Sequence, residues 1–198
     1  QQFDQLASQG FTTLKCKVGA LDWASELQML QKIRSRYPAH SFALRVDANG
    51  AFSNLDLDEV RSRLEALREL EVHSIEQPLA PHDRERLAQI CREDILPIAL
   101  DESMIGLSTM MERERLLDDV QPHYLVLKPS LLGGLDSVTT WSRLAEQRGI
   151  QWWATSALES NVGLRAIAQW VAVQPAVADG EETIPQGLGT GGLFHNNV

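Results

Sequence analysis

The amino-acid sequence predicts an α/β fold, a TIM-type (β/α) barrel built of parallel strands. Short apolar runs rich in β-branched residues recur along the chain, and segments with helical periodicity lie between them. Polar residues end these runs at intervals of 25 to 30 residues. One strand, one crossover helix and two loops need about that length, and repeated units of this kind build a parallel sheet. Seven consecutive units favour a closed barrel over an open doubly wound sheet.

The strands that we expect are seven apolar runs: Leu14–Val18, Phe42–Asp47, Val72–Glu76, Pro97–Asp101, Tyr124–Lys128, Gln151–Ser156 and Ile184–Leu188. Three helices are indicated by apolar stripes, which contain Trp23, Leu27, Leu30 and Ile33; Val60, Leu64, Leu67 and Leu70; and Leu164, Ile167 and Val171. Their expected N-caps are Asp22, Ser53 and Ser160. A doubly wound sheet usually carries a glycine-rich phosphate turn after its first strand, and Val18-Gly19-Ala20 is not such a turn.

The beginning of the chain predicts a helix rather than a strand. Residues 3–10 resemble the last part of a helix, so the first expected strand corresponds to the second strand of a barrel. We therefore expect one partial barrel domain over residues 1–198 that holds strands two to eight. Because a parallel sheet that lacks a strand leaves its edges unpaired, we expect additional N-terminal sequence to supply the first strand.

Composition restricts the kinds of partner. The chain of 198 residues is 43% hydrophobic and has a net charge of -9 without a basic patch, which argues against nucleic acid. No apolar run reaches the roughly 20 residues that a membrane span needs, and the first residues, which lack a basic segment followed by an apolar one, do not predict a signal peptide. Cys16 and Cys91 are far apart in sequence, and we expect both to be unpaired in a reducing cytoplasm.

Charged residues stand where the expected strands end. Asp47, Glu76 and Asp101 close three consecutive strands, and because side chains alternate across a strand, Lys15 and Lys17 share one face of the strand before them. Any one of these acids could be a helix cap or a surface ion-pair partner, and the lysines could be exposed on an edge strand. Three acids on adjacent strand ends favour a functional site, because the carboxyl ends of barrel strands meet at one mouth.

Three carboxylates without a histidine or cysteine ligand are typical of a hard-cation site. We therefore expect Mg²⁺, with Mn²⁺ as the alternative. A small-molecule carboxylate bound to such a cation has its α-proton acidified, because negative charge can develop on the bound oxygens. The base must be neutral, and we expect the second ammonium group, the nearby metal ion and burial to lower the pKa of the lysines. Lys128, which ends the sixth barrel strand, would approach from the other side as a second acid or base or as a fixed positive charge.

The ordered motifs resemble the enolase superfamily, in its muconate-lactonising-enzyme-like subgroup. They cover residues 14–192 and are Lys15-Cys16-Lys17, Asp47-Ala48-Asn49, Glu76-Gln77-Pro78, Asp101-Glu102-Ser103 and Lys128. Within the subgroup the chain is most similar to the o-succinylbenzoate synthases. Ser130 stands where the racemases, epimerases and cycloisomerases more often carry a second lysine, and residues 155–160 and 187–191 add to the similarity.

This resemblance implies a lyase that dehydrates 2-succinyl-6-hydroxy-2,4-cyclohexadiene-1-carboxylate to 2-succinylbenzoate in menaquinone biosynthesis. It implies that Lys17 and Lys128 are catalytic and that an N-terminal capping domain closes the barrel mouth. The ligands that it implies for Mg²⁺ are Asp47, Glu76 and Asp101, and the residues that it implies for the substrate pocket are Lys15, Arg45, Asn49, Ser156 and Gly189. Two alternatives stay open, namely an N-succinylamino acid racemase or dipeptide epimerase of the same superfamily and a non-catalytic metal-binding barrel.

Overall fold

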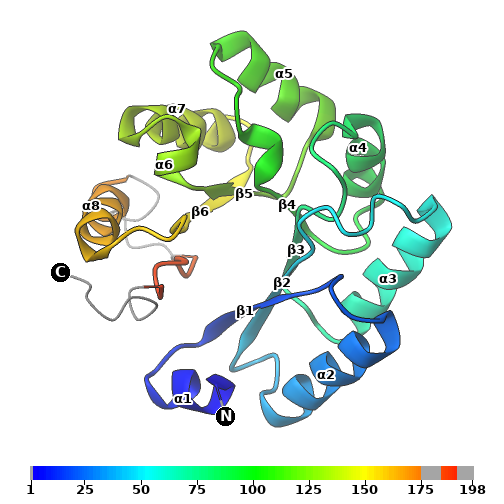
Figure 1. Cartoon of the computed structure of the whole chain (residues 1–198). Helices are drawn as coiled ribbons and strands as arrows, with labels where there is room; N and C mark the ends of the chain where they lie inside the picture. The colour runs from blue at the N-terminus through cyan, green and yellow to red at the C-terminus, as the bar shows by residue number, and fades with distance from the viewer. Residues whose placement is uncertain (1, 175–183, 191–198) are drawn as a thin grey trace. The chain divides into compact units, whose positions relative to one another are not determined.

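The computed structural model describes residues 2–174 and 184–190 (Figure 1). The chain divides into two compact units, which are described separately. The first unit contains residues 1–103 and 118–123, and the second contains residues 104–117 and 124–198. In both units strands alternate with helices along the chain, as the sequence predicts.

The first unit is built on four parallel strands that pair with their neighbours in chain order. They are β1 (Thr13–Lys17), β2 (Ala43–Asp47), β3 (Ser74–Glu76) and β4 (Ile98–Leu100). Each lies inside one of the predicted runs or within one residue of it, so the first four strand predictions are confirmed. Apart from Ala43, which is partly exposed, the apolar side chains of these strands are buried, as two-sided burial of a parallel sheet requires.

Helices connect these strands, and α2, α3 and α4 lie on one side of them (Figure 1). The helical elements are α1 (Gln2–Ser8), α2 (Trp23–Arg36), α3 (Leu57–Glu69), α4 (Arg84–Glu93), the short 3-10 helix η1 (Glu102–Met104) and α5 (Met110–Val120), whose last residues belong to this unit. The helix predicted near the beginning of the chain and the stripes of α2 and α3 are confirmed. Leu30, Val60, Leu64 and Leu67 from these stripes are fully buried.

One of the predicted helix caps in the first unit is confirmed and one is wrong. The side chain of Asp22 accepts a hydrogen bond from the Ser25 backbone N–H and caps α2. Ser53 does not cap α3, because the hydroxyl of Ser53 donates to the carbonyl of Gly50 and accepts from a neighbouring loop. The cap is Asp56, which forms a capping box with Glu59.

A single arginine, Arg34, binds several backbone carbonyls at the amino-terminal end of the strands of this unit. The guanidinium of Arg34 donates four hydrogen bonds of 2.8 to 3.0 Å to backbone carbonyls. The acceptors follow α2 and α3 or precede β2, and they are the carbonyls of Tyr37, Phe42, Leu70 and Glu71. Helix ends leave carbonyls without intrahelical partners, so this planar fork satisfies groups that would otherwise be costly to bury.

The second unit contains two parallel strands, and α7 packs against both of them. The strands are β5 (Tyr124–Leu127) and β6 (Gln151–Ala154), and the helices are α6 (Pro129–Leu132), α7 (Leu135–Glu146) and α8 (Asn161–Ala172). The stripe predicted in α8 is confirmed, since Leu164, Ile167 and Val171 are buried. Ser160 holds the N-cap position of α8, but its side chain makes no capping hydrogen bond.

The predicted strand Ile184–Leu188 is only partly borne out, because in the segment that the structure describes it forms one isolated bridge. Gly187 pairs in parallel with Thr155. The N–H of Ala154 would donate to a backbone carbonyl if the two strands paired further. It donates instead to the side-chain oxygen of Gln186 at 2.6 Å. The side chain therefore takes the acceptor role that a longer ladder would give to the backbone.

Both cysteines are free and buried, as the sequence predicts. Burial raises the pKa of the Cys16 thiol to about 11 and that of Cys91 to about 12, since a thiolate is costly in apolar surroundings. Within the described residues, no helix has both the length and the apolar character that crossing a membrane would require.

Candidate active site

The first unit brings two predicted ligands to the same level of its sheet. In the strand register Lys17 lies opposite Asp47, and Asp47 lies opposite Glu76. Both carboxylate side chains are 1% exposed. Two neighbouring carboxylates at this depth repel each other and lose hydration, so they need a cation beside them.

The cation beside them is the ammonium group of Lys15. Its Nζ lies 3.0 Å from Oδ2 of Asp47 and 2.9 Å from Oε2 of Glu76, and it donates a hydrogen bond to each. The Lys15 side chain is 35% exposed, so its amine lies at the boundary between the buried acids and solvent. The predicted parity of Lys15 and Lys17 is confirmed, because both amines contact Asp47.

The pKa of Lys15 changes in the direction opposite to that predicted. Burial alone would lower it, but the charges of Glu76 and Asp47 outweigh burial and raise it. Burial would likewise raise the pKa of Asp47, but the two lysines outweigh it and lower it. Burial raises the pKa of Glu76 to about 7, and the charges of Asp47 and Asp101 add to that rise against the opposing effect of Lys15. The prediction rested on the second ammonium group, a bound metal ion and burial, and it left out the attraction of Lys15 to the two acids.

Lys17 makes a different set of contacts at the end of β1. Its Nζ donates to Oδ2 of Asp47 at 2.9 Å and also to Oδ1 of Asn49. The amide nitrogen of Asn49 donates to Oε1 of Glu102 at 2.7 Å. Asn49, predicted as a pocket residue, thus links Lys17 to Glu102, the first residue of η1.

The loop after β1 is held by a buried glutamate that the sequence analysis did not identify. The carboxylate of Glu26 in α2 accepts hydrogen bonds of 2.8 to 2.9 Å from the backbone N–H groups of Gly19, Ala20 and Leu21. Gly19 has a φ of +92°, and a Cβ there would lie 2.2 Å from the Cβ of Ala51. Glycine at this turn therefore allows the loop beside Lys17 to pack against the loop after β2.

Asp101 stands one residue beyond β4 and is buried, but its level differs from that of the other two acids. Glu76 lies opposite Ala99, so Asp101 lies two residues further along, a step of about 6.6 Å in a strand. The backbone N–H groups of Asp101 and Ser103 donate to Oε1 of Gln77 at 3.1 and 3.2 Å. The side chain of Gln77, which the sequence analysis did not select, thus fixes the loop that carries Asp101.

Arg45 lies on the same strand as Asp47 but below the strand ends. It is buried and stands level with Lys15 and Ser74. Burial lowers the pKa of His73 to about 4, and the charge of Arg45 adds to this effect. The position of Arg45 places it under the pair of acids rather than among the residues of the strand ends, and its predicted contact with substrate stays a prediction.

In the second unit three predicted residues follow the ends of β5 and β6 or lie in the segment 184–190. Lys128 is the N-cap residue of α6, Ser156 follows β6 by two residues, and Gly189 follows the Gly187 bridge by two residues. The carboxylate of Glu159 accepts from Ser156 at 2.6 Å and from Ser130. Glu159 therefore joins α6, which follows β5, to the loop after β6.

The donor chemistry fits a divalent cation, whereas the present arrangement does not gather the ligands around one point. Asp47, Glu76 and Asp101 offer hard oxygen donors on three consecutive strands, and the Lys15 ammonium already lies between two of them. In the part of the chain that the structure describes, no three His, Cys, Asp or Glu side chains are placed to hold one metal ion. The metal site remains a prediction that is supported by the donor set.

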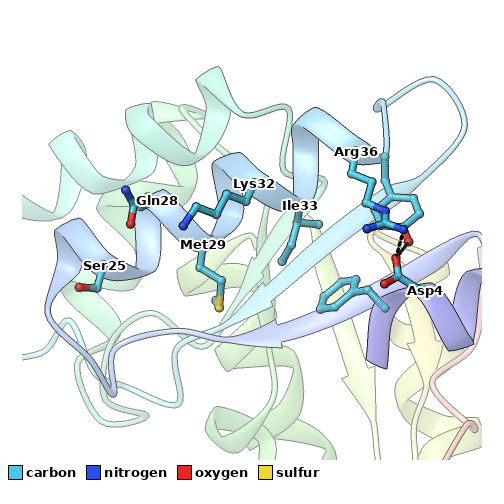
Figure 2. A pocket seen from close by; sticks show the side chains of 9 residues that line it. Asp4, Ser25, Gln28, Met29, Lys32, Ile33 and Arg36 are labelled. Atoms are coloured by element: carbon cyan, nitrogen blue, oxygen red, sulfur yellow. Dashed lines mark hydrogen bonds and ion pairs between the residues drawn. The ribbon is translucent and has the colours of Figure 1, made fainter. Parts of the chain in front are cut away.

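A pocket of about 320 Å³ lies elsewhere in the first unit, between α1 and α2 (Figure 2). Met29 and Ile33 line it together with polar side chains of α2, and Arg36 at its edge forms an ion pair of 2.9 Å with Asp4 of α1. None of the predicted site residues lines this pocket.

The described features define an α/β protein whose parallel strands carry paired acids and lysines at their carboxyl ends. The model of the enolase C-terminal domain-like family matches residues 1–197. The o-succinylbenzoate synthase of Desulfotalea psychrophila is 44% identical over all of this chain and 51% of its own length. That of Thermobifida fusca is 32% identical over 98% of this chain and 56% of its own length. The N-succinylamino acid racemase of Thermus thermophilus is 32% identical over 78% of this chain and 39% of its own length.

The chain belongs to the enolase C-terminal domain-like family. Among solved structures, MenC from Desulfotalea psychrophila matches all of this chain and 52% of its own chain with a TM-score of 0.87 and 44% identity. Muconate lactonizing enzyme from Pseudomonas putida, at 22% identity, shares the fold with a TM-score of 0.84 over 99% of this chain. The chain spans about half the length of these relatives.

Proposed function

We propose that this chain carries the catalytic part of an o-succinylbenzoate synthase. The proposed reaction removes water from 2-succinyl-6-hydroxy-2,4-cyclohexadiene-1-carboxylate and gives 2-succinylbenzoate, a step toward menaquinone. The observation that carries the proposal is the similarity at 44% identity over the whole chain to an o-succinylbenzoate synthase, combined with the cluster of Lys15, Lys17, Asp47 and Glu76.

The lysines and acids would have separate roles in this reaction. Lys17 would accept the proton from the carbon beside the substrate carboxylate and pass a proton to the departing hydroxyl, so that a C–H and a C–O bond break and water leaves. Lys128 would provide positive charge from the second unit and a cation–π contact with the forming ring. Arg45, Asn49, Ser156 and Gly189 are proposed to line the substrate pocket.

A divalent cation, Mg²⁺ or alternatively Mn²⁺, would supply positive charge for the oxygens of the substrate carboxylate. Asp47, Glu76 and Asp101 are the side chains that would hold it, because their hard oxygen donors suit such an ion. Lys15 pairs with two of them and would keep the acids close together in the absence of the cation. Its remaining proposed role is to contact the substrate.

The surroundings of the reaction belong to the same proposal. A capping domain in the same polypeptide would cover the mouth of a barrel that residues 1–198 form in part, and would exclude water that weakens the charge interactions. The isolated 198 residues are accordingly expected to show almost no turnover. We place the protein in the cytoplasm, where two buried thiols remain reduced.

The decisive experiment is an assay of the complete natural polypeptide that contains these residues. Loss of the cyclohexadiene absorbance should depend on Mg²⁺ and should fall by orders of magnitude in a Lys17→Ala variant. Metal affinity should survive in that variant, because the three carboxylates are retained. Turnover that is unaffected by Lys17→Ala would refute the assigned base, and the absence of any turnover in the unmodified protein would refute the synthase.

The second candidate is an N-succinylamino acid racemase, which is favoured by the 32% identity to the Thermus thermophilus enzyme of that name. The two activities are distinguished by exchange of solvent deuterium into the α-carbon of an N-succinylamino acid. Ser130, whose hydroxyl donates to Glu159, argues for the synthase, because the racemases more often carry a lysine at this position. A barrel that binds metal without catalysis would show no dependence on Lys17 at all.

A further inference from the structure

Lys17 ends β1 with a side chain that is 63% exposed, yet its amine makes two defined contacts. One acceptor is Oδ2 of Asp47, and the same oxygen also accepts a hydrogen bond from Lys15 at 3.0 Å. The Asp47 contact is therefore shared between two amines. The second acceptor, Oδ1 of Asn49, receives a hydrogen bond from Lys17, whereas Lys15 donates to Asp47 and Glu76. A long flexible side chain needs such a second contact to keep one orientation.

The orientation of the Asn49 amide is set by Glu102. A carboxylate can only accept hydrogen bonds, so Oε1 of Glu102, at 2.7 Å, requires the NH₂ group of Asn49 to face it. The carbonyl oxygen of Asn49 must then face Lys17. The reversed amide would direct an NH₂ group at an ammonium group and a carbonyl at a carboxylate, and both contacts would be repulsive.

The backbone holds both members of this pair in place. Asn49 has a φ of +43°, a left-handed conformation that asparagine tolerates better than most residues, and its N–H donates to Oδ1 of Asp47 at 3.1 Å. Gln77 accepts from the N–H of Ser103, the residue after Glu102, and therefore fixes the start of η1. Backbone hydrogen bonds therefore anchor the chain at Asn49 and beside Glu102.

One carboxylate oxygen of Glu102 is buried in a way that is unfavourable for folding stability. Its Oε2 is enclosed and has no hydrogen-bond partner among the described residues. An enclosed carboxylate oxygen without a partner is unfavourable for folding, so a residue that served stability alone would be better replaced by an amide or an apolar side chain.

We infer that Asn49 and Glu102 form a positioning pair, which holds the amine of Lys17 in the orientation from which it takes the substrate's proton. Asn49 contacts the base, and Glu102 acts through Asn49. The inference rests on the proposed function for the role of Lys17, and it adds to that function a reason for the amine to be held in one place beside Asp47.

The test compares two replacements of Glu102 in the complete natural polypeptide. Glu102→Leu removes the acceptor, so kcat should fall by about 10- to 100-fold while KM changes by less than about threefold, because misplacing a catalytic group by about 1 Å costs rate more than binding. Glu102→Gln offers its side-chain oxygen to Asn49 and should recover kcat to within about threefold of the unmodified protein. The matched control is Glu65→Leu, which removes an exposed carboxylate of α3.

A second measurement does not depend on turnover. Brief labelling of lysine amines with a succinimidyl ester, read by mass spectrometry, reports how freely each amine moves and reacts. Lys17 should label several-fold faster in Glu102→Leu than in the unmodified protein, whereas exposed Lys32 should label at the same rate in both. If the unmodified protein lacks turnover but this contrast is present, the proposed reaction fails and the positioning pair stands.

Two results would overturn the inference. Equal loss of kcat in Glu102→Leu and Glu102→Gln, accompanied by equal lowering of the melting temperature, would show that the carboxylate supports only the fold. Unchanged labelling of Lys17 in Glu102→Leu would show that Asn49 keeps its orientation without Glu102.

Discussion

Replacing Lys15 by methionine tests the central feature of the site, which is one ammonium group between two buried acids. Each contact of about 3 Å corresponds to a gross attraction of about 5 kcal/mol at an effective dielectric constant near 20. Hydration of the separated charges offsets most of this attraction, and removing one partner of a buried pair typically costs about 3 to 5 kcal/mol. Because Lys15 is 35% exposed, we expect the lower end of that range, about 3 kcal/mol.

The assay is thermal unfolding followed by circular dichroism in the presence of EDTA. A loss of about 3 kcal/mol corresponds to a melting temperature lower by about 6 to 12 °C for a domain of this size. Lys32→Met, an exposed lysine of α2, is the matched control and should change the melting temperature by no more than about 2 °C. If Mg²⁺ binds the acids, it should restore more stability to Lys15→Met than to the unmodified protein, because the cation replaces the lost ammonium group.

The reasoning would be refuted by equal melting temperatures of Lys15→Met and Lys32→Met in EDTA. Such a result would mean that solvent reaches Asp47 and Glu76 well enough to replace the lysine. A large fall in the melting temperature that Mg²⁺ does not reduce would still agree with stabilisation by the ion pairs of Lys15. It would, however, contradict the proposed metal site.

Three further predictions concern the first unit. Arg34→Lys should lower the melting temperature by about 5 °C or more, because a single ammonium cannot bond four carbonyls, whereas Arg36→Lys at the surface should have little effect, and equal effects would contradict this. The pKa of His73, about 4 when folded, lies below its unfolded value near 6.5, so the unfolded state binds more protons between these pH values. His73 should therefore add up to about 2 kcal/mol of stability from pH 4.5 to pH 7, against the opposite contribution of Glu76, so its effect is measured as the difference in urea unfolding between the unmodified protein and His73→Gln; equal pH slopes of the two proteins would exclude His73 as a source. Finally, Cys16 and Cys91 should resist iodoacetamide in the folded protein and react in urea, because burial raises the pKa of both thiols; fast labelling of the folded protein would show that they are accessible.

The positions of the strands and of the main charged residues could be predicted because they depend on short-range regularities. Alternation along β1 places Lys15 and Lys17 on one face, and the spacing of the apolar runs places Asp47 and Glu76 at adjacent strand ends. The capping box of α3 was also visible in the sequence as Asp56 followed three residues later by Glu59, and the prediction of Ser53 overlooked that signal.

Other features depend on how separate loops approach each other, which a local pattern does not contain. The charge balance around Lys15 is one example, since the direction of its pKa shift follows from two acids on two other strands rather than from the neighbouring Lys17. The level of Asp101 is another, because the stagger between β3 and β4 sets it two residues beyond the partner of Glu76. Neither the stagger nor the number of acids reached by one amine can be read from the spacing of residues along the chain.

The amide side chains of Asn49 and Gln77, which follow the strand ends, also make contacts that a local sequence pattern does not contain. Asn49, two residues after Asp47, and Gln77, one residue after Glu76, both adopt positive φ. The amide of Asn49 connects Lys17 to Glu102, and the amide of Gln77 connects to the backbone of Asp101 and to the hydroxyl of Ser103 in the loop after β4. An amide can accept on one side and donate on the other, so it can join an ammonium to a carboxylate, or a backbone N–H to a hydroxyl, where a charged side chain could satisfy only one of them. The strands therefore bring the acids and lysines to one edge of the first unit, where the amide of Asn49 contacts Lys17 and Glu102 and the amide of Gln77 holds the backbone of Asp101 and Ser103.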